Sequence, residues 1–124
     1  MRAFIPAVLW GIIILIISLM PGSSLPNFSF FDLFQPDKVG HLVFYGIFVA
    51  LMLLGFHQRM SPEEIEVKTV AKVVAFGICY GILIELLQYS FFTGRNFDVL
   101  DIIANIIGCF VGVSSLKLFS LFLR

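Results

Sequence analysis

Four long apolar runs, separated by polar and turn-forming residues, dominate the pattern of hydrophobic and polar positions in this chain. They cover residues 3–20, 39–56, 70–92 and 99–123. A helix of about 20 residues crosses the ~30 Å hydrocarbon core of a bilayer, so each run is long enough to be a transmembrane helix. The pattern therefore predicts one all-α domain over residues 1–124, an integral membrane four-helix bundle.

The first run also resembles a signal peptide, because Arg2 precedes an apolar stretch. That stretch continues to Met20, which is longer than the usual apolar region of a signal peptide, and no small-x-small cleavage site follows it. We therefore expect the segment to be retained as the first helix of the bundle.

The distribution of lysine and arginine indicates how the helices are oriented. If both termini lie in the cytoplasm, six of these residues are on the cytoplasmic side and two, Lys38 and Arg95, are on the outer side. Basic residues concentrate on the cytoplasmic side of membrane proteins, so the sequence predicts an N-in, C-in topology. The six cytoplasmic residues are Arg2, Arg59, Lys68, Lys72, Lys117 and Arg124.

The outer connection between the first two helices is rich in phenylalanine. It is bracketed by Pro21-Gly22 and Pro36, and its apolar residues are Phe28, Phe30, Phe31, Leu33 and Phe34. An irregular loop cannot lie exposed in hydrocarbon with its backbone unpaired. We therefore expect the loop either to anchor the protein at the membrane interface or to fold over the mouth of the bundle as a lid.

Composition agrees with a membrane protein and limits its partners. Hydrophobic residues make up 60% of the chain and the mean hydropathy is +1.04, which is too apolar for a water-soluble surface. The formal net charge is zero, which argues against a nucleic-acid partner. Cys79 and Cys109 lie within apolar runs, where we expect them to pack rather than to form a disulfide. The lipid bilayer is the predicted partner, and the oligomeric state is left open.

Polar residues interrupt the apolar pattern at the outer ends of the last three helices. A charge at bilayer depth costs ~2.5–3.5 kcal/mol, so each such residue needs a partner or a function. Residues three or four apart share a helix face, and the polar faces lie at similar depths. We therefore predict that they converge on one outward-facing pocket. The residues are Asp37, Lys38 and His41, then Glu85 and Gln88, then Arg95, Asp98, Asp101 and Asn105.

Small residues favour this convergence. Gly77 and Gly81 precede Glu85 at four-residue steps, and Gly108 and Gly112 follow Asn105 on the fourth helix. Glycines at this spacing allow helix backbones to approach closely, which brings polar side chains of neighbouring helices within hydrogen-bonding range. The glycines are therefore expected to line the helix contacts beneath the polar residues.

The charge balance of the polar set limits its chemistry. Four carboxylates face Lys38 and Arg95, which leaves two negative charges that require protonation, a protonated histidine, a bound cation or access to water. A carboxylic acid beside a histidine is a workable acid–base pair, so His41 and Glu85 are the catalytic candidates. Lys38 and Arg95 suit a phosphate or carboxylate head group. The remaining candidates for ligand binding are Asp37, Gln88, Asp98, Asp101 and Asn105.

Two other interpretations apply to the same residues. His41, Glu85 and an aspartate could hold a divalent cation. However, zinc sites usually have more than one histidine or cysteine ligand, and two nearby basic residues oppose metal binding. We therefore predict no metal or cofactor. Polar residues in membrane bundles also often only hold helices together, each hydrogen bond contributing roughly 0.6 kcal/mol. Gln88, Asn105 and Asp98 fit this structural role as well as a functional one.

At these positions the chain resembles the VanZ-like family of small bacterial membrane proteins. The shared pattern is Asp37-Lys38-x-x-His41-x-x-x-Tyr45, then Glu85-x-x-Gln88, then Arg95-x-x-Asp98-x-x-Asp101-x-x-x-Asn105-x-x-Gly108. Order and spacing agree with the family pattern from Pro21 onward. The resemblance implies a four-helix, multi-pass protein of the bacterial cytoplasmic membrane that is connected with the cell envelope. The namesake of the family is linked to teicoplanin resistance, by a mechanism that the resemblance does not supply.

The residues and the resemblance together predict a protein that binds an anionic, lipid-linked envelope molecule in an outward-facing pocket. Chemical modification of that molecule, and a contribution to glycopeptide resistance, are further expectations. Whether a reaction is catalysed is left open. The alternatives are a non-catalytic membrane interaction module whose polar cluster is structural, and a protein that binds teicoplanin directly.

Overall fold

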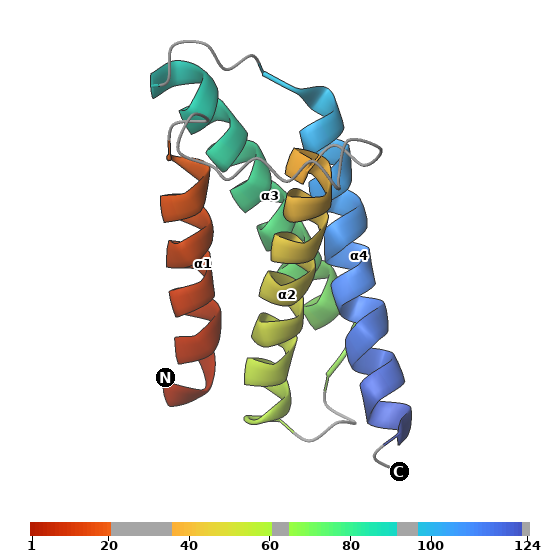
Figure 1. Ribbon diagram of the computed structural model, residues 1–124. Coiled ribbons are helices and arrows are strands. Elements are labelled where there is room, and N and C mark those ends of the chain that lie inside the picture. Colours follow the sequence, from red (N-terminus) through yellow and green to blue (C-terminus); the bar gives the residue numbers. More distant parts are fainter. Residues whose placement is uncertain (21–35, 61–64, 92–96, 123–124) are drawn as a thin grey trace.

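The chain folds into a bundle of four helices that run alternately up and down (Figure 1). The computed structural model describes residues 1–20, 36–60, 65–91 and 97–122, apart from the side chains of residues 36, 37 and 120–122. The predicted all-α, four-helix architecture is confirmed, and α1 begins at the end of the bundle where α4 ends. The helices are a 3-10 turn at Arg2–Phe4, α1 (Ile5–Ser18), α2 (Pro36–His57), α3 (Val67–Phe91) and α4 (Val99–Phe122).

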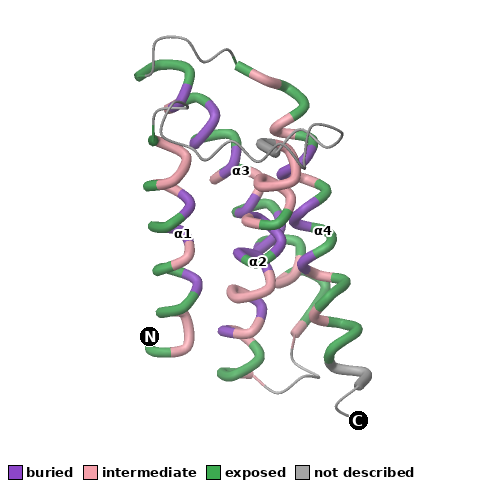
Figure 2. The backbone as a smooth tube through the Cα atoms, viewed as in Figure 1, coloured by how far each residue is buried: buried purple, intermediate pink, exposed green. Residues whose placement is uncertain are grey.

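The surface of the bundle is that of a membrane protein. Among the residues that the structure describes, three helices are long and apolar enough to cross a bilayer, with spans at Lys38–His57, Val67–Phe91 and Val99–Phe119 and mean hydropathies of 2.1, 2.0 and 2.0. The shares of these spans buried inside the bundle are 33%, 33% and 28%, and exposed large apolar side chains lie along α3 and α4 (Figure 2). A helix in a water-soluble bundle would carry polar residues on that face.

The first helix is shorter than the other three. The apolar run predicted a span over residues 3–20, but the α-helix itself covers only Ile5–Ser18, and 14 residues at ~1.5 Å each extend about 21 Å. Hydropathy does not distinguish the 3-10 turn at Arg2–Phe4 from the α-helix that follows it, and Pro6 lies in the first turn of that helix. The described part of α1 is thus below the length that a full crossing needs.

Glycines bring α2 and α4 into backbone contact. A Cβ atom added at Gly108 would fall on the backbone of Leu42, and one added at Gly112 would fall on the backbone of Gly46. A step of four residues along α4, from Gly108 to Gly112, matches a step of four along α2, from Leu42 to Gly46, as expected for two helices that run in the same direction. A side chain at either glycine would therefore force α2 and α4 apart, which confirms the role predicted for the fourth-helix glycines.

The glycines of α3 allow its contact with α4. A Cβ at Gly77 would lie 3.0 Å from the sulfur of Cys109, and a Cβ at Gly81 would meet the side chain of Asn105. Cys109 is fully buried in this contact, as predicted, whereas Cys79 lies on the exposed side of α3, so the prediction that it packs inside is wrong. Both cysteines are free thiols, which agrees with the absence of a disulfide framework.

Within the described part of the chain, three hydrogen bonds join the first helix to α2 and α3. The indole nitrogen of Trp10 donates to the carbonyl of Phe44 at 2.9 Å, and the hydroxyl of Tyr80 donates to the carbonyl of Gly11 at 2.7 Å. The amide of Gln88 donates to the carbonyl of Ser18 at the end of α1, at 2.6 Å. These bonds fix α1 beside α2 and α3 and leave α4 on the other side of the bundle.

Candidate functional site

Three helices each contribute one titratable side chain to a cluster near the start of α2 and α4. His41 comes from α2, Glu85 from α3 and Asp101 from α4, and one potential ligand atom from each lies within 4.8 Å of the others. We call these three residues the polar cluster. The convergence that the helical spacing predicted for them is therefore present in the fold.

His41 is held in one orientation by its neighbours. Its Nδ1 lies 2.9 Å from the side-chain oxygen of Asn105, which is 1% exposed. With the amide of Asn105 placed so that its oxygen faces the ring, Nδ1 donates the hydrogen bond and Nε2 is the ring nitrogen left for a ligand or a proton. That Nε2 lies 3.8 Å from Oδ2 of Asp101. The ring of Tyr45, which is fully buried, stacks against the imidazole with a 6.2 Å centroid distance.

Glu85 faces the interior of the bundle and not the lipid. It is 3% exposed, and its Oε1 accepts a hydrogen bond from the backbone N–H of Asp98 at 3.0 Å. This bond fixes the end of α3 to the start of α4. Its other oxygen, Oε2, is buried and has no hydrogen-bond partner among the residues that the structure describes. Glu85 therefore offers one carboxylate oxygen to whatever occupies the cluster.

Asp98 caps α4. Its Oδ1 accepts a hydrogen bond from the backbone N–H of Leu100 at 2.8 Å, which satisfies one of the unpaired donors of the first helical turn. Its Oδ2 lies 3.2 Å from the ammonium of Lys38. The hydrogen bond from the Leu100 amide and that from Lys38 hold the pKa of Asp98 below its usual value, so the carboxylate is charged at neutral pH. An aspartate directly before an apolar run is the sequence signal for this cap.

Lys38 of α2 lies beside two aspartates, Asp98 directly before α4 and Asp101 in its first turn. Its ammonium lies 3.2 Å from Asp98 and 3.8 Å from Oδ1 of Asp101. The side chain of Lys38 is 25% exposed, so part of it is accessible from the end of the bundle. The residue is therefore placed beside the polar cluster, as predicted, but its charge is already engaged by carboxylates.

The remaining sequence-predicted residues divide into two groups. Gln88 is 3% exposed and donates to the end of α1, which is the structural role that the sequence allowed for it. Arg95, the side chain of Asp37 and the Phe-rich loop at residues 21–35 lie outside the described part of the chain. Their roles as head-group contact, binding residue and anchor or lid remain predictions.

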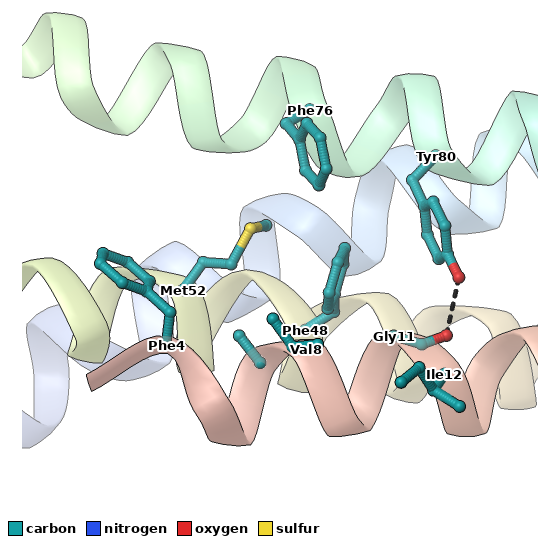
Figure 3. Close-up of a pocket in the computed structure, with 9 residues that line it drawn as sticks. Phe4, Val8, Gly11, Ile12, Phe48, Met52, Phe76 and Tyr80 are labelled. Carbon is teal, nitrogen blue, oxygen red and sulfur yellow. Dashed lines mark hydrogen bonds between the residues drawn. The ribbon is translucent and has the colours of Figure 1, made fainter. Parts of the chain in front are cut away.

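A separate apolar groove lies between α1, α2 and α3 (Figure 3). Its volume is about 350 Å³, and Tyr80 is the only one of its lining residues with a polar side chain. The hydrogen bond from Tyr80 to Gly11 crosses the groove. No residue of the polar cluster lines it, so the groove and the cluster are distinct features. Hydropathy could not predict the groove, because its lining residues are as apolar as residues that face lipid or pack in the core. They are Phe4, Ala7, Val8, Gly11, Ile12, Phe48, Met52, Phe76 and Tyr80.

The arrangement of the cluster allows proton transfer or ligand binding at one point. An imidazole nitrogen and two carboxylates meet there, and Tyr45, Asn105 and Asp98 fix their orientations. A family model described as VanZ/LLP1 matches residues 4–120, which include every residue of the cluster. Comparison with curated proteins and with solved structures gives no match.

Proposed function

The chain belongs to the VanZ/LLP1 family, and on that premise we propose that it binds an anionic, lipid-linked molecule of the bacterial cell envelope at the polar cluster. The observation that carries the proposal is the convergence of His41, Glu85 and Asp101 from three helices within 4.8 Å. The chain has few charged residues, and polar groups at membrane depth are costly unless they have a partner or a task.

The position of the cluster along the helices supports a ligand that is part lipid. Lys38 and His41 lie in the first turns of α2, and the remainder of that span is apolar. A head group bound at the cluster would keep its tail beside apolar helix surfaces, where the bilayer continues. Lys38 is 25% exposed, and a phosphate bound there would share its ammonium with Asp98 and Asp101.

The cluster also supports chemical modification of the bound molecule. Nδ1 of His41 donates to Asn105, so Nε2 is the atom that can accept a proton, and Asp101 lies 3.8 Å away to stabilise the imidazolium that forms. In this proposal His41 and Glu85 act as the acid–base pair. The protein contributes to glycopeptide resistance by changing the amount or the chemistry of the envelope molecule that it binds.

A binding measurement tests the proposal. We expect purified protein in nanodiscs to bind a polyprenyl phosphate at least about tenfold more tightly than the uncharged polyprenol with the same tail, a difference of ~1.4 kcal/mol. Native mass spectrometry or microscale thermophoresis would measure both affinities. Equal affinities for the phosphate and the alcohol would contradict head-group recognition.

A purely structural cluster is the second candidate, and one observation favours it. The polar contacts of the site also tie helices together, since His41 bonds to Asn105, Lys38 pairs with Asp98, and Glu85 accepts from the Asp98 amide. Under this alternative the protein acts through contacts with other proteins. Binding of neither lipid in the nanodisc experiment would favour it.

The proposed outward position of the cluster makes a separate prediction about the membrane. Ser90, at the end of α3, and Gln58, after α2, are both exposed and lie at opposite ends of the bundle. In intact cells that carry Cys79→Ala, we expect an impermeant thiol reagent to label Ser90→Cys but not Gln58→Cys. The reverse labelling pattern would place the cluster on the cytoplasmic side.

A further inference from the structure

We infer that the polar cluster binds a divalent cation, with His41, Glu85 and Asp101 as its protein ligands. One potential ligand atom from each residue lies within 4.8 Å of the others, and Nε2 of His41 is 3.8 Å from Oδ2 of Asp101. Ligand atoms of a tetrahedral site with ~2.1 Å bonds are about 3.4 Å apart. Small side-chain rotations would therefore bring the three donors to bonding distance of one ion.

The environment of Glu85 points to a ligand independently of this spacing. The side chain is 3% exposed, and its Oε2 is buried without a hydrogen-bond partner in the described part of the chain. Oε1 already accepts from the Asp98 amide, so the carboxylate is fixed in place rather than free to turn toward water. Buried charged groups in proteins are paired or coordinate metals. A cation at the cluster would satisfy Oε2.

His41 has the orientation of a metal ligand. A ligating histidine usually donates its second ring N–H to a carbonyl or carboxylate, which fixes the ring and leaves the other nitrogen for the metal. The Nδ1 hydrogen of His41 is directed at the side-chain oxygen of Asn105, at 2.9 Å. Asn105 is itself held against Gly81, where a Cβ atom would collide with it. Asn105 is therefore the residue that positions His41.

Lys38 does not occupy the position that a cation would take. Its ammonium lies 3.2 Å from Oδ2 of Asp98 and approaches Asp101 from the Oδ1 side at 3.8 Å. The oxygen of Asp101 that faces His41 is Oδ2. The sequence-based objection that a nearby lysine opposes a metal is thus weakened, because Lys38 and the cation would contact different edges of Asp101.

The donor set selects the type of cation. One imidazole and two carboxylates suit Mn²⁺ or Zn²⁺ better than Mg²⁺ or Ca²⁺, which prefer oxygen donors alone. Three protein ligands leave at least one coordination position open. Nε2 of His41 cannot both bind a cation and accept a proton, so the inference rests on the binding part of the proposed function and replaces the acid–base role of His41. On that basis we place an oxygen of the anionic head group at the open position. The cation would then explain how a cluster rich in carboxylates binds an anion.

Titration with Mn²⁺ alone tests the site. Purified protein is stripped with EDTA, exchanged into chelator-free detergent buffer and titrated while electron paramagnetic resonance measures free Mn²⁺. We expect one saturable site per chain that excess Zn²⁺ displaces. Glu85→Gln and Asp101→Asn should each weaken Mn²⁺ binding at least about tenfold, and Asn105→Ala should weaken it by about ten- to a hundredfold through the lost orientation of His41.

Glu66→Gln is the matched control, because it neutralises an exposed carboxylate before α3, at the other end of the bundle. Its Mn²⁺ affinity should equal that of the wild type. Mn²⁺ should also raise the melting temperature of the wild type and of this control but not that of Glu85→Gln. Wild-type protein without saturable Mn²⁺ binding, or unchanged affinity in both Glu85→Gln and Asp101→Asn, would overturn the cation site.

The lipid measurement separates this inference from the proposed function. Polyprenyl phosphate binding that requires Mn²⁺ and disappears in EDTA supports both. Binding of the lipid that is unchanged by EDTA leaves the proposed function standing and overturns the bridging cation. Binding of Mn²⁺ by a protein that does not bind the lipid supports the cation site and overturns the proposed function.

Discussion

Replacing Glu85 or His41 with glutamine is expected to abolish function while the protein remains folded. In Glu85→Gln the amide oxygen can still accept the hydrogen bond from the Asp98 backbone, which Oε1 accepts at 3.0 Å in the native chain, but the group no longer ionises. In His41→Gln the side chain stays polar but loses the titrating imidazole. If the proposed function holds, both variants should lose the proposed binding of the polyprenyl phosphate and the proposed effect on teicoplanin susceptibility.

The melting temperature in detergent decides what such a loss means. Replacing a surplus buried carboxylate by a neutral group often leaves a bundle as stable or more stable, so we expect no decrease for Glu85→Gln in metal-free buffer. Glu66→Gln, on an exposed carboxylate remote from the cluster, should behave as the wild type in every measurement. Full binding and full cellular effect in both cluster variants would show that the cluster is structural.

Adding one methyl group at Gly112 is expected to destabilise the bundle strongly. The Cβ atom of alanine at this position would collide with the backbone of Gly46, and backbone cannot move aside as a flexible side chain can. Overpacking of this kind typically costs ~1–3 kcal/mol, and because two helices must separate we expect the upper part of that range. Gly108→Ala, which meets the backbone of Leu42, should have a similar effect.

Gly40→Ala is the internal control for this prediction. Gly40 lies in α2, one of the two helices in this contact, and a Cβ atom added there has no atom within 4 Å. Alanine is a better helix former than glycine by up to ~1 kcal/mol, so this variant should be neutral or slightly more stable. Measured by thermal unfolding in detergent, the melting temperature of Gly112→Ala should therefore be at least about 5 °C lower than that of Gly40→Ala. Equal melting temperatures would contradict the close backbone contact of α2 with α4.

The fold was largely predictable because a membrane imposes a simple rule. Backbone groups in hydrocarbon must be hydrogen-bonded within the segment, so a long apolar run has to be a helix. The predicted run at residues 70–92 corresponds to α3 at Val67–Phe91, and the run at 99–123 corresponds to α4 at Val99–Phe122. The first run was the exception, because hydropathy counts apolar residues and does not register the 3-10 turn that precedes Ile5.

The site was predictable at the level of helix faces and not at the level of partners. Helical spacing placed His41, Glu85 and Asp101 on faces that could converge, and the structure brings them within 4.8 Å. The same spacing placed Gln88 beside Glu85, yet its amide bonds to Ser18 of α1. Asp98 was expected to bind a ligand, and its side chain also caps α4.

The amino-acid sequence by itself determined which segments are helices, that the bundle faces lipid, and which few polar residues must find partners inside it. These properties follow from length, hydropathy and the period of the helix, which are local. The tertiary structure decided that Asn105 orients His41, that Lys38 engages Asp98, and that one oxygen of Glu85 is buried without a described partner. Such details depend on how far each helix is rotated and shifted against its neighbours. The close glycine contacts between helices set that rotation and shift, and no single segment encodes them.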